Sequence, residues 1–380
     1  MRLLLAIALQ AAAPPTASDD IVVQGRRLDT AYKACVAGGC SVLRDAQVSI
    51  AMAEQQFRDG AYVKAKHTMA AAVARNRRHA ATDPKPVAAL YEAFATVAFQ
   101  EGDTKFYRTA VIGQVRTLRD HLPESDPARR EAPLIVGDMW IKLGQPRIAA
   151  GIYETAERQA TAAADVRGAL VARLRRAWLA AASRDRTKAK DLLHEAAAWP
   201  AVADPALQAM LRVAELRIAA QSADTTAIDR LIGEIGHMTT AQPVLIWAPP
   251  YLPSIDAVVK QNAMRFGDVA IATGSSSEVV PIEWADIGFW IGPDGRTREM
   301  EVLRSVGANA WTAPILRQIA SRRYTSVADA TGQGVYRIER MTNRGTYGVP
   351  IGSLIRRRSG PASLQVLDLT PAPGTPIAPK

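Results

Sequence analysis

The chain has 380 residues, enough for two or three domains, and 48% of them are hydrophobic and 22% charged. These values are those of an ordinary globular protein, which excludes a disordered or fibrous chain. The formal net charge of +10 at pH 7 suggests anionic neighbours. The arginines are spread along the chain, however, apart from the short cluster Arg356–Arg358, and no base-stacking or groove-reading motif accompanies them. The sequence therefore does not favour a nucleic-acid partner.

Residues 1–18 have the pattern of a secretory signal peptide. They contain one arginine, an apolar run from Leu3 to Leu9 and then small residues, so cleavage is expected near Ala17 or Ser18. The apolar run is far shorter than the ~20 residues that a membrane-spanning helix needs. We therefore expect a periplasmic protein, and the alternative is an uncleaved N-terminus that stays as an inner-membrane anchor.

The N-terminal segment 19–45 contains both cysteines of the chain, Cys35 and Cys40, on either side of the pair Gly38-Gly39. In an oxidising compartment the glycines would let the chain fold back and join the two thiols as a disulfide. Two unrelated thiols are the alternative. The five histidines are scattered and none stands at metal-ligand spacing, so we predict no metal site.

Residues 46–240 repeat a helical pattern in which Gly60 and Gly144 each end one helix and the next helix begins two residues later. Corresponding small or packing positions recur every 38 to 42 residues, at Ala65, Tyr107, Ala149, Ala189 and Ala227. This pattern resembles the tetratricopeptide repeat, whose standard unit has ~34 residues. Proline-containing segments such as Pro84–Pro86 are predicted to be the loops that absorb the difference. One helical hairpin cannot bury both of its faces, so such units stack, and arrays of this kind usually bind peptides or proteins.

Residues 284–348 change from the helical pattern to strand patterns and strong turn chemistry. The predicted elements are a strand over Trp284–Ile291, a Gly-Pro-Asp-Gly turn over Gly292–Gly295, a strand over Thr297–Val306, a helix from the N-cap Asn309 to Ser321, and a strand over Val335–Met341. Strict alternation places Met300, Val302 and Arg304 on one face of the second strand. The helix is expected to bury its apolar residues Trp311, Ile315, Leu316 and Ile319.

This β-β-α-β order, with the turn Pro293–Arg296, the basic-aromatic step Arg322–Tyr324 and the glycine turn before Val335–Ile338, resembles the C-terminal domain of the TonB energy-transducer family. The match covers about a sixth of the chain. The sequence departs from the family pattern in two respects. The family usually has a proline two residues after the aromatic of the step, where this chain has Ser326. The family also joins its domain to a membrane anchor through a long proline-rich spacer, where this chain has a helical array.

The resemblance implies a way of binding partners. In the family, the last strand offers unpaired backbone groups at a sheet edge, and an extended segment of an outer-membrane transporter adds to it as a further strand. The partner-binding residues implied here are Val335, Tyr336, Arg337, Ile338, Glu339, Arg340 and Met341. The alternatives for this strand are ordinary sheet pairing or burial of its edge by a strand over residues 364–369, whose sequence alternates.

Taken together, the sequence predicts a mixed fold: an all-α tetratricopeptide-like array, a proline-rich linker over 241–283, a small α+β TonB-like domain, and a partly disordered tail over 349–380. No catalytic, cofactor or phosphate-binding motif stands out, so we predict that the protein is not an enzyme and has no cofactor. The expected function is that of a periplasmic accessory to TonB-dependent outer-membrane transport. The alternatives are a periplasmic scaffold that binds a protein or peptide without any role in transport, and an enzyme subunit whose catalytic partner lies elsewhere.

Overall fold

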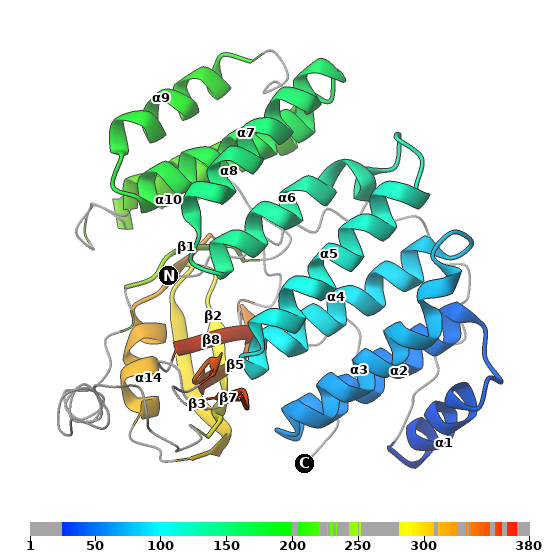
Figure 1. Ribbon diagram of the computed structural model, residues 1–380. Helices are drawn as coiled ribbons and strands as arrows, with labels where there is room; N and C mark the ends of the chain where they lie inside the picture. The colour runs from blue at the N-terminus through cyan, green and yellow to red at the C-terminus, as the bar shows by residue number, and fades with distance from the viewer. Residues whose placement is uncertain are drawn as a thin grey trace. The chain divides into compact units, whose positions relative to one another are not determined.

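The computed structural model describes residues 25–199, 204–220, 243–249, 281–307, 311–325, 334–349, 354–358 and 363–370, together with residues 226, 229–230, 233, 251 and 332. Helices make up most of the first half, and a small antiparallel sheet follows, so the chain has a mixed fold (Figure 1). The chain divides between Ala132 and Pro133 into two compact units. That division falls inside helix α6 (Pro127–Lys142), so the later helices belong to the same unit as the sheet.

The first unit is built from successive helices, each of which packs against the next (Figure 1). They are α1 (Gly25–Val36), α2 (Val42–Arg58), α3 (Tyr62–Asn76), the short 3-10 helix η1 (Arg77–His79), α4 (Pro84–Glu101) and α5 (Thr104–His121). The helical part therefore begins before residue 46, the boundary predicted from the repeat pattern. The helix α1 is held to α2 by a cluster of buried residues, Leu28, Cys35, Val48 and Met52.

Glycines end several of these helices, as the repeat pattern predicts. The backbone φ angle is +78° at Gly60, +97° at Gly102 and +73° at Gly144. A residue with a Cβ atom is strained in this left-handed conformation, which glycine adopts freely, so glycine is the usual residue just past a helix end. The predicted packing positions that the structure describes are buried, namely Ala65, Tyr107, Ala149 and Ala189, whereas Ala227 lies outside the described residues.

The second unit continues the helical arrangement before the sheet begins. Its helices after α6 are α7 (Pro146–Ala162), α8 (Val166–Ala182), α9 (Arg186–Ala197) and α10 (Pro205–Ala220). A Cβ atom at Gly137 of α6 would overlap the ring of Tyr153 of α7, so the small residue allows a close helix–helix approach. The tryptophans of this region are partly buried against the cores between helices, which supports their interpretation as packing residues: Trp140, Trp178 and Trp199.

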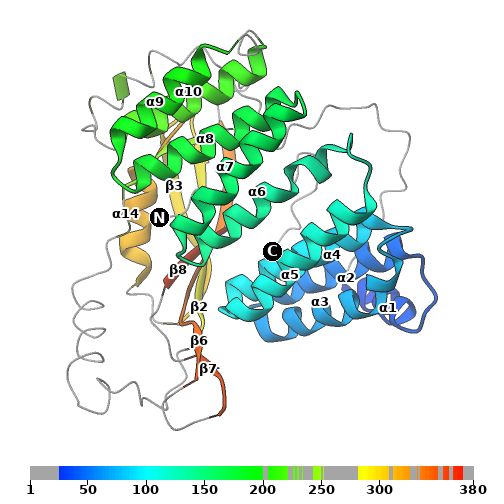
Figure 2. The same ribbon diagram turned by 45° about the horizontal axis from the view of Figure 1, so that its top comes forward.

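The main sheet has four antiparallel strands in the order β3-β2-β5-β8 (Figure 2). Its strands are β2 (Glu283–Ile291), β3 (Thr297–Val306), β5 (Val335–Arg344) and β8 (Ser363–Asp368), and helix α14 (Thr312–Ala320) follows β3. The predicted β-β-α-β order is therefore present. Alternate residues of β2 face the helix, because side chains of a strand alternate between its two sides. The resulting core consists of Ala285, Ile287, Phe289, Ile291, Trp311, Ile315, Ile319, Tyr324 and Met341.

Part of the predicted linker 241–283 belongs to this folded unit. The short strand β1 (Leu245–Trp247) pairs with β4 (Arg323–Tyr324), directly after α14. The guanidinium of Arg217 in α10 donates a hydrogen bond of 2.8 Å to the carbonyl oxygen of Leu245, and Tyr251 packs against the core of the sheet. These residues therefore connect helix α10 to the sheet domain instead of acting as a free spacer.

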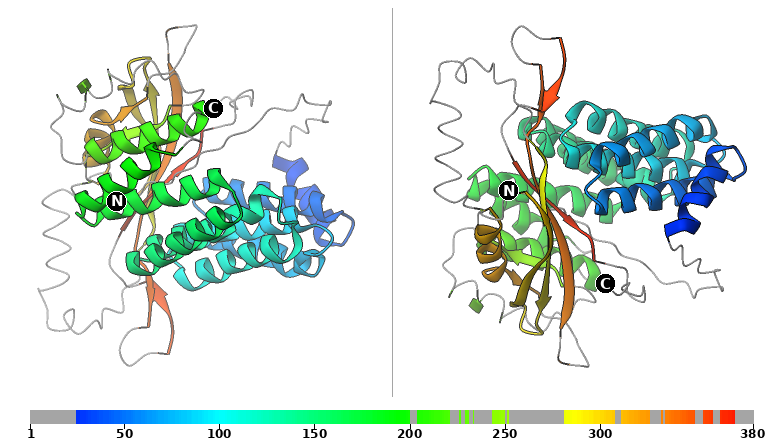
Figure 3. Two further views of the ribbon diagram at one scale, coloured as in Figure 1. Left: turned by 90° about the horizontal axis from the view of Figure 1, so that it is seen from above. Right: turned by 90° about the horizontal axis from the view of Figure 1, so that it is seen from below.

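A second small hairpin follows β5. The strands β6 (Tyr347–Gly348) and β7 (Arg357–Arg358) pair antiparallel, and they extend beyond the end of the main sheet (Figure 3).

Candidate protein-binding sheet edge

The strand implied as the partner-binding edge, β5, lies inside the sheet. It pairs with β2 from Val335 to Asn343, and its residues Glu339–Arg344 pair on the other side with β8. The expectation of an open edge at Glu339, Arg340 and Met341 is therefore wrong, and burial by the 364–369 segment, the alternative left open, is what the structure has. The reason is the packing of β8, since its residues Leu364 and Val366 cover part of the core on which α14 also lies.

The earlier half of β5 is covered less completely. The carbonyl oxygen of Ile338 accepts a hydrogen bond of 2.8 Å from the backbone N–H of Leu369, and its N–H donates to the hydroxyl of Thr370 at 3.1 Å. In the described part of the chain, no strand pairs with Val335–Arg337 on the side away from β2. The segment after β8 thus covers the implied site as far as Ile338.

One outer edge of the sheet, at β3, is exposed but protected against pairing. Its pairing with β2 shifts register twice, and Glu299 has a φ angle of +51°, so the strand contains bulges. These bulges also break the strict alternation predicted for the strand. Bulges and charged side chains are the features by which edge strands avoid unwanted partners. The charged residues of β3 are Arg298, Glu299, Glu301 and Arg304.

The other outer edge, at β8, lacks these protections. Its pairing with β5 runs without a register shift, and Asp368 is its only charged residue. The backbone N–H of Leu369 donates a hydrogen bond to Ile338 of β5. The backbone groups of successive residues in an antiparallel strand point alternately toward and away from the neighbouring strand. Those of Leu364, Val366 and Asp368 therefore point away from β5. Within the described residues no main-chain hydrogen bond reaches these outward groups. They can therefore accept a further strand.

Buried charges fix the register of β5 on β2. Asp286 and Arg340 stand directly opposite each other in the two strands, with exposed fractions of 2% and 0%. The Asp286 carboxylate accepts hydrogen bonds from Nε and Nη2 of Arg340, the latter at 2.9 Å, and from Nη2 of Arg304 at 2.6 Å. The Arg340 guanidinium also lies 3.8 Å from the centre of the Trp284 ring. A shift of one residue would place these side chains on the other face and leave buried charges unpaired.

The basic-aromatic step after α14 is also part of the interior. Arg322 donates hydrogen bonds to Glu339 of β5 at 2.7 Å and to the hydroxyl of Tyr324 at 3.2 Å. Burial, together with the nearby charge of Glu339, raises the pKa of Tyr324 to about 12. Arg323 points elsewhere and binds Asp229 at 2.7 Å. These contacts join the step to β5 and to Asp229, so its residues have a structural role in holding the sheet domain together.

Sequence reasoning missed the residues that hold this site together. Asp229 binds both Arg296 of the β2–β3 turn, at 2.8 Å, and Arg323, although 67 residues or more separate it from either. Asp286, inside the strand pattern of β2, is a buried partner of the two arginines Arg304 and Arg340. Nothing in the local sequence pattern marks such long-range pairs, and only the unusual charge inside a strand pattern could have indicated them.

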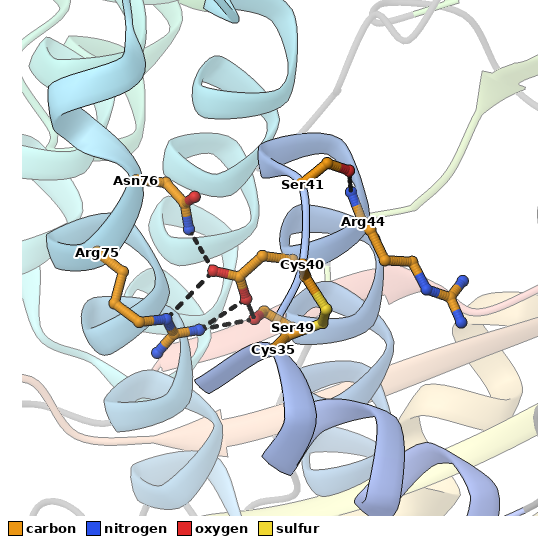
Figure 4. The surroundings of a disulfide bond; sticks show 8 residues. Cys35, Cys40, Ser41, Arg44, Ser49, Arg75 and Asn76 are labelled. Atoms are coloured by element: carbon orange, nitrogen blue, oxygen red, sulfur yellow. Dashed lines mark hydrogen bonds and ion pairs between the residues drawn. A yellow bond between two sulfur atoms is a disulfide. The ribbon is translucent and has the colours of Figure 1, made fainter. Parts of the chain in front are cut away.

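The predicted disulfide lies outside this sheet. Cys35 and Cys40 are joined, with their Cα atoms 4.8 Å apart, between the end of α1 and the start of α2 (Figure 4). In the adjoining helices, Asp45 accepts hydrogen bonds from Arg75, Asn76 and Ser49. Burial raises the pKa of this carboxyl group, but the hydrogen bonds outweigh it and leave the pKa below its ordinary value.

Reduction of the disulfide is expected to lower the free energy of unfolding of the first unit by about 2 kcal/mol, because the closed loop is short. Urea unfolding followed by circular dichroism, with and without a reductant, would measure this change. The double variant Cys35→Ser/Cys40→Ser is the control, since it should be as stable as the reduced protein and insensitive to the reductant. Equal stability of the oxidised and reduced proteins would contradict the expectation.

The described residues contain neither a membrane-spanning helix nor a metal-ligand cluster. No helix among them is both long and apolar enough to cross a membrane. No group of three or more histidine, cysteine or acidic side chains there is arranged to hold a metal ion. The predicted signal peptide, residues 1–18, lies outside the described residues.

Comparisons with known proteins identify no relative of this chain. No family model matches the chain, and neither any curated protein nor any solved structure is significantly similar to it.

Proposed function

We propose that the sheet binds an extended segment of a protein partner by strand addition at the outer edge of β8. The observation that carries this proposal is the regular, weakly charged edge, where the outward backbone groups of Leu364, Val366 and Asp368 have no main-chain partner in the described residues. An extended peptide gains its affinity at such an edge from main-chain hydrogen bonds, and its side chains give specificity.

The TonB resemblance supports a particular class of partner. In that family the partner is an outer-membrane transporter, and its strand adds next to the last strand of the β-β-α-β unit. Here β8 occupies that place, so the partner would add one position farther out, as a fifth strand. We infer that the protein is an exported accessory of TonB-dependent transport, and that the helical hairpins carry the sheet domain.

Substitution of Val366 by proline tests the proposal. The backbone N–H of Val366 faces outward, so proline removes a donor for the added strand while the ladder between β8 and β5 stays intact. We expect Val366→Pro to weaken binding at least tenfold, because the rigid ring also obstructs a strand placed against this edge. The measurement is titration with synthetic peptides from the periplasmic N-terminal segments of TonB-dependent transporters encoded in the same genome.

The control is Val366→Ala, which loses the same side-chain contact with the core but keeps the N–H group. It should bind peptide nearly as well as the original chain, and circular dichroism should show that both variants are folded. Equal affinity of the original and proline chains would rule out addition at β8. If no peptide of the panel binds the original chain, the assignment to outer-membrane transporters is wrong.

A further inference from the structure

The guanidinium of Arg217 is buried between helix α10 and strand β1 without an acidic partner. Its exposed fraction is 7%, and its Nε donates a hydrogen bond of 2.8 Å to the carbonyl oxygen of Leu245. Figure 1 shows α10 beside β1, and both belong to the second unit. Within the described chain, no carboxylate forms an ion pair with Arg217 and no acceptor bonds to its Nη1 or Nη2. The N–H groups of both Nη atoms are therefore unused.

Two other buried arginines of the same unit are each neutralised by a carboxylate. Arg340 bonds to Asp286, and Arg322 donates to Glu339 at 2.7 Å. A buried ion without such a partner is strongly destabilising, because it has lost its water and gained no opposite charge. In agreement with this, burial lowers the pKa of Arg217 to about 10, and the group is still charged at neutral pH. No described side chain compensates this charge.

A backbone N–H group of β1 faces the same side as the guanidinium. The N–H of Val244 donates to the Thr325 hydroxyl at 3.0 Å, and the Val244 carbonyl accepts from the Thr325 N–H at 2.9 Å. Backbone groups of successive residues in a strand point to opposite sides, so those of Leu245 point toward Arg217. The Leu245 carbonyl is bonded to Arg217, whereas its N–H has no partner in the described part of the chain. This N–H and the two Nη groups form a cluster of donors.

We propose that the interface of α10 and β1 binds the carboxylate or phosphate group of a small anion, held by both Nη groups of Arg217 and by the Leu245 N–H. A guanidinium binds two oxygens of such a group through parallel N–H groups, and the edge formed by Nη1 and Nη2 is the one that remains here. Neither Nη atom is sealed from solvent, so an anion can reach them. Bound there, it supplies the negative charge that the interface lacks.

This site is separate from the edge proposed for strand addition. The donors come from α10 and β1, and the added strand would lie along β8, so either proposal can fail without the other. A purely structural role of Arg217, as the link between α10 and β1, predicts a different result. Its loss would then lower the stability of the unit by the same amount with and without an anion.

Thermal unfolding in different salts tests the site. The full chain is heated in phosphate, acetate or chloride at equal ionic strength, which keeps general screening constant. We expect a saturable rise of Tm in phosphate or acetate relative to chloride, because a ligand of the folded state stabilises it. The more effective salt identifies the anionic group. Calorimetric titration of Arg217→Gln should show a loss of affinity of about tenfold or more, since charge-assisted hydrogen bonds are lost.

Two further variants separate binding from folding. Arg212→Gln removes an exposed arginine of the same helix, paired with Glu215, and should bind the anion like the original chain. Arg217→Met removes the buried charge. In chloride its Tm should lie within about 3 °C of the original, because loss of a hydrogen bond and relief of an uncompensated charge offset each other. In phosphate and acetate it should show no rise.

Two results would overturn the proposal. One is an equal Tm of the original chain in phosphate, acetate and chloride. The other is an undiminished rise of Tm in both Arg217→Gln and Arg217→Met, which would place the bound anion elsewhere on the chain.

Discussion

Replacing Asp286 by alanine is expected to lower the free energy of unfolding of the sheet by about 3–5 kcal/mol. The variant leaves Arg340 with a buried charge at an exposed fraction of 0% and removes the acceptor of two of its hydrogen bonds. Taking an ion out of water costs several kcal/mol, and the variant removes the carboxylate that offsets part of this cost for Arg340. Most small domains have a total stability of about 5–15 kcal/mol, so the sheet would be marginal or unfolded.

Denaturation followed by tryptophan fluorescence would measure this effect, since Trp284 and Trp290 lie in the affected strand. The control is Asp294→Ala in the β2–β3 turn, whose ion pair with Arg298 is largely exposed and should contribute less than about 1 kcal/mol. The double variant Asp286→Leu/Arg340→Met should recover much of the loss, because it removes both charges together. Similar stability of Asp286→Ala and Asp294→Ala would show that the buried pair does not hold the sheet.

The elements of the sheet domain could be predicted because their signals are local. The Asp-Gly turn and the flanking alternation identified β2 and β3, and apolar spacing identified α14. Glycines that need a positive φ angle marked the helix ends in the array. These features depend on a few neighbouring residues, so a single sequence contains them.

The effect of a proline depends on its position within an element, as the start of α4 shows. The segment Pro84–Pro86 was predicted as a loop, but it forms the first turn of α4, which begins at Pro84. The first residues of a helix need no N–H partner inside the helix, so proline is accepted there although it breaks a helix farther along. The sequence pattern alone does not say which side of the proline is helical.

The position of β5 could not be predicted because it depends on pairing between distant segments. The alternation over residues 364–369 indicated a possible strand, but its neighbour in the sheet is decided by packing on the common core. The bulge at Glu299 and the pairing of Asp286 with Arg340 are likewise properties of the assembled sheet. The candidate binding edge is therefore at β8, because β5 lies between β2 and β8.

The second large effect is expected in the first unit, where Glu101→Ala should cost about 3 kcal/mol. The Lys66 ammonium group is buried and bonds to the Glu101 carboxylate at 2.6 Å and to Asp103 at 3.3 Å, so it links α3 to the end of α4. Removing the nearer carboxylate leaves the lysine with the weaker partner and a desolvated charge. The cost should lie at the lower end of the range for broken buried pairs, because Asp103 remains.

Hydrogen exchange read by mass spectrometry would localise this effect, because amide protection reports local opening free energies along the chain. We expect faster exchange in α3, α4 and α5, with the strands of the sheet unchanged, since the two compact units have separate cores. Glu101→Gln is the conservative control, as it keeps an acceptor for Lys66, and Asp29→Ala removes only an exposed partner of Lys33. Faster exchange in β2 and β5 as well would mean that the two units unfold as one, and unchanged exchange everywhere would mean that the buried lysine does not need Glu101.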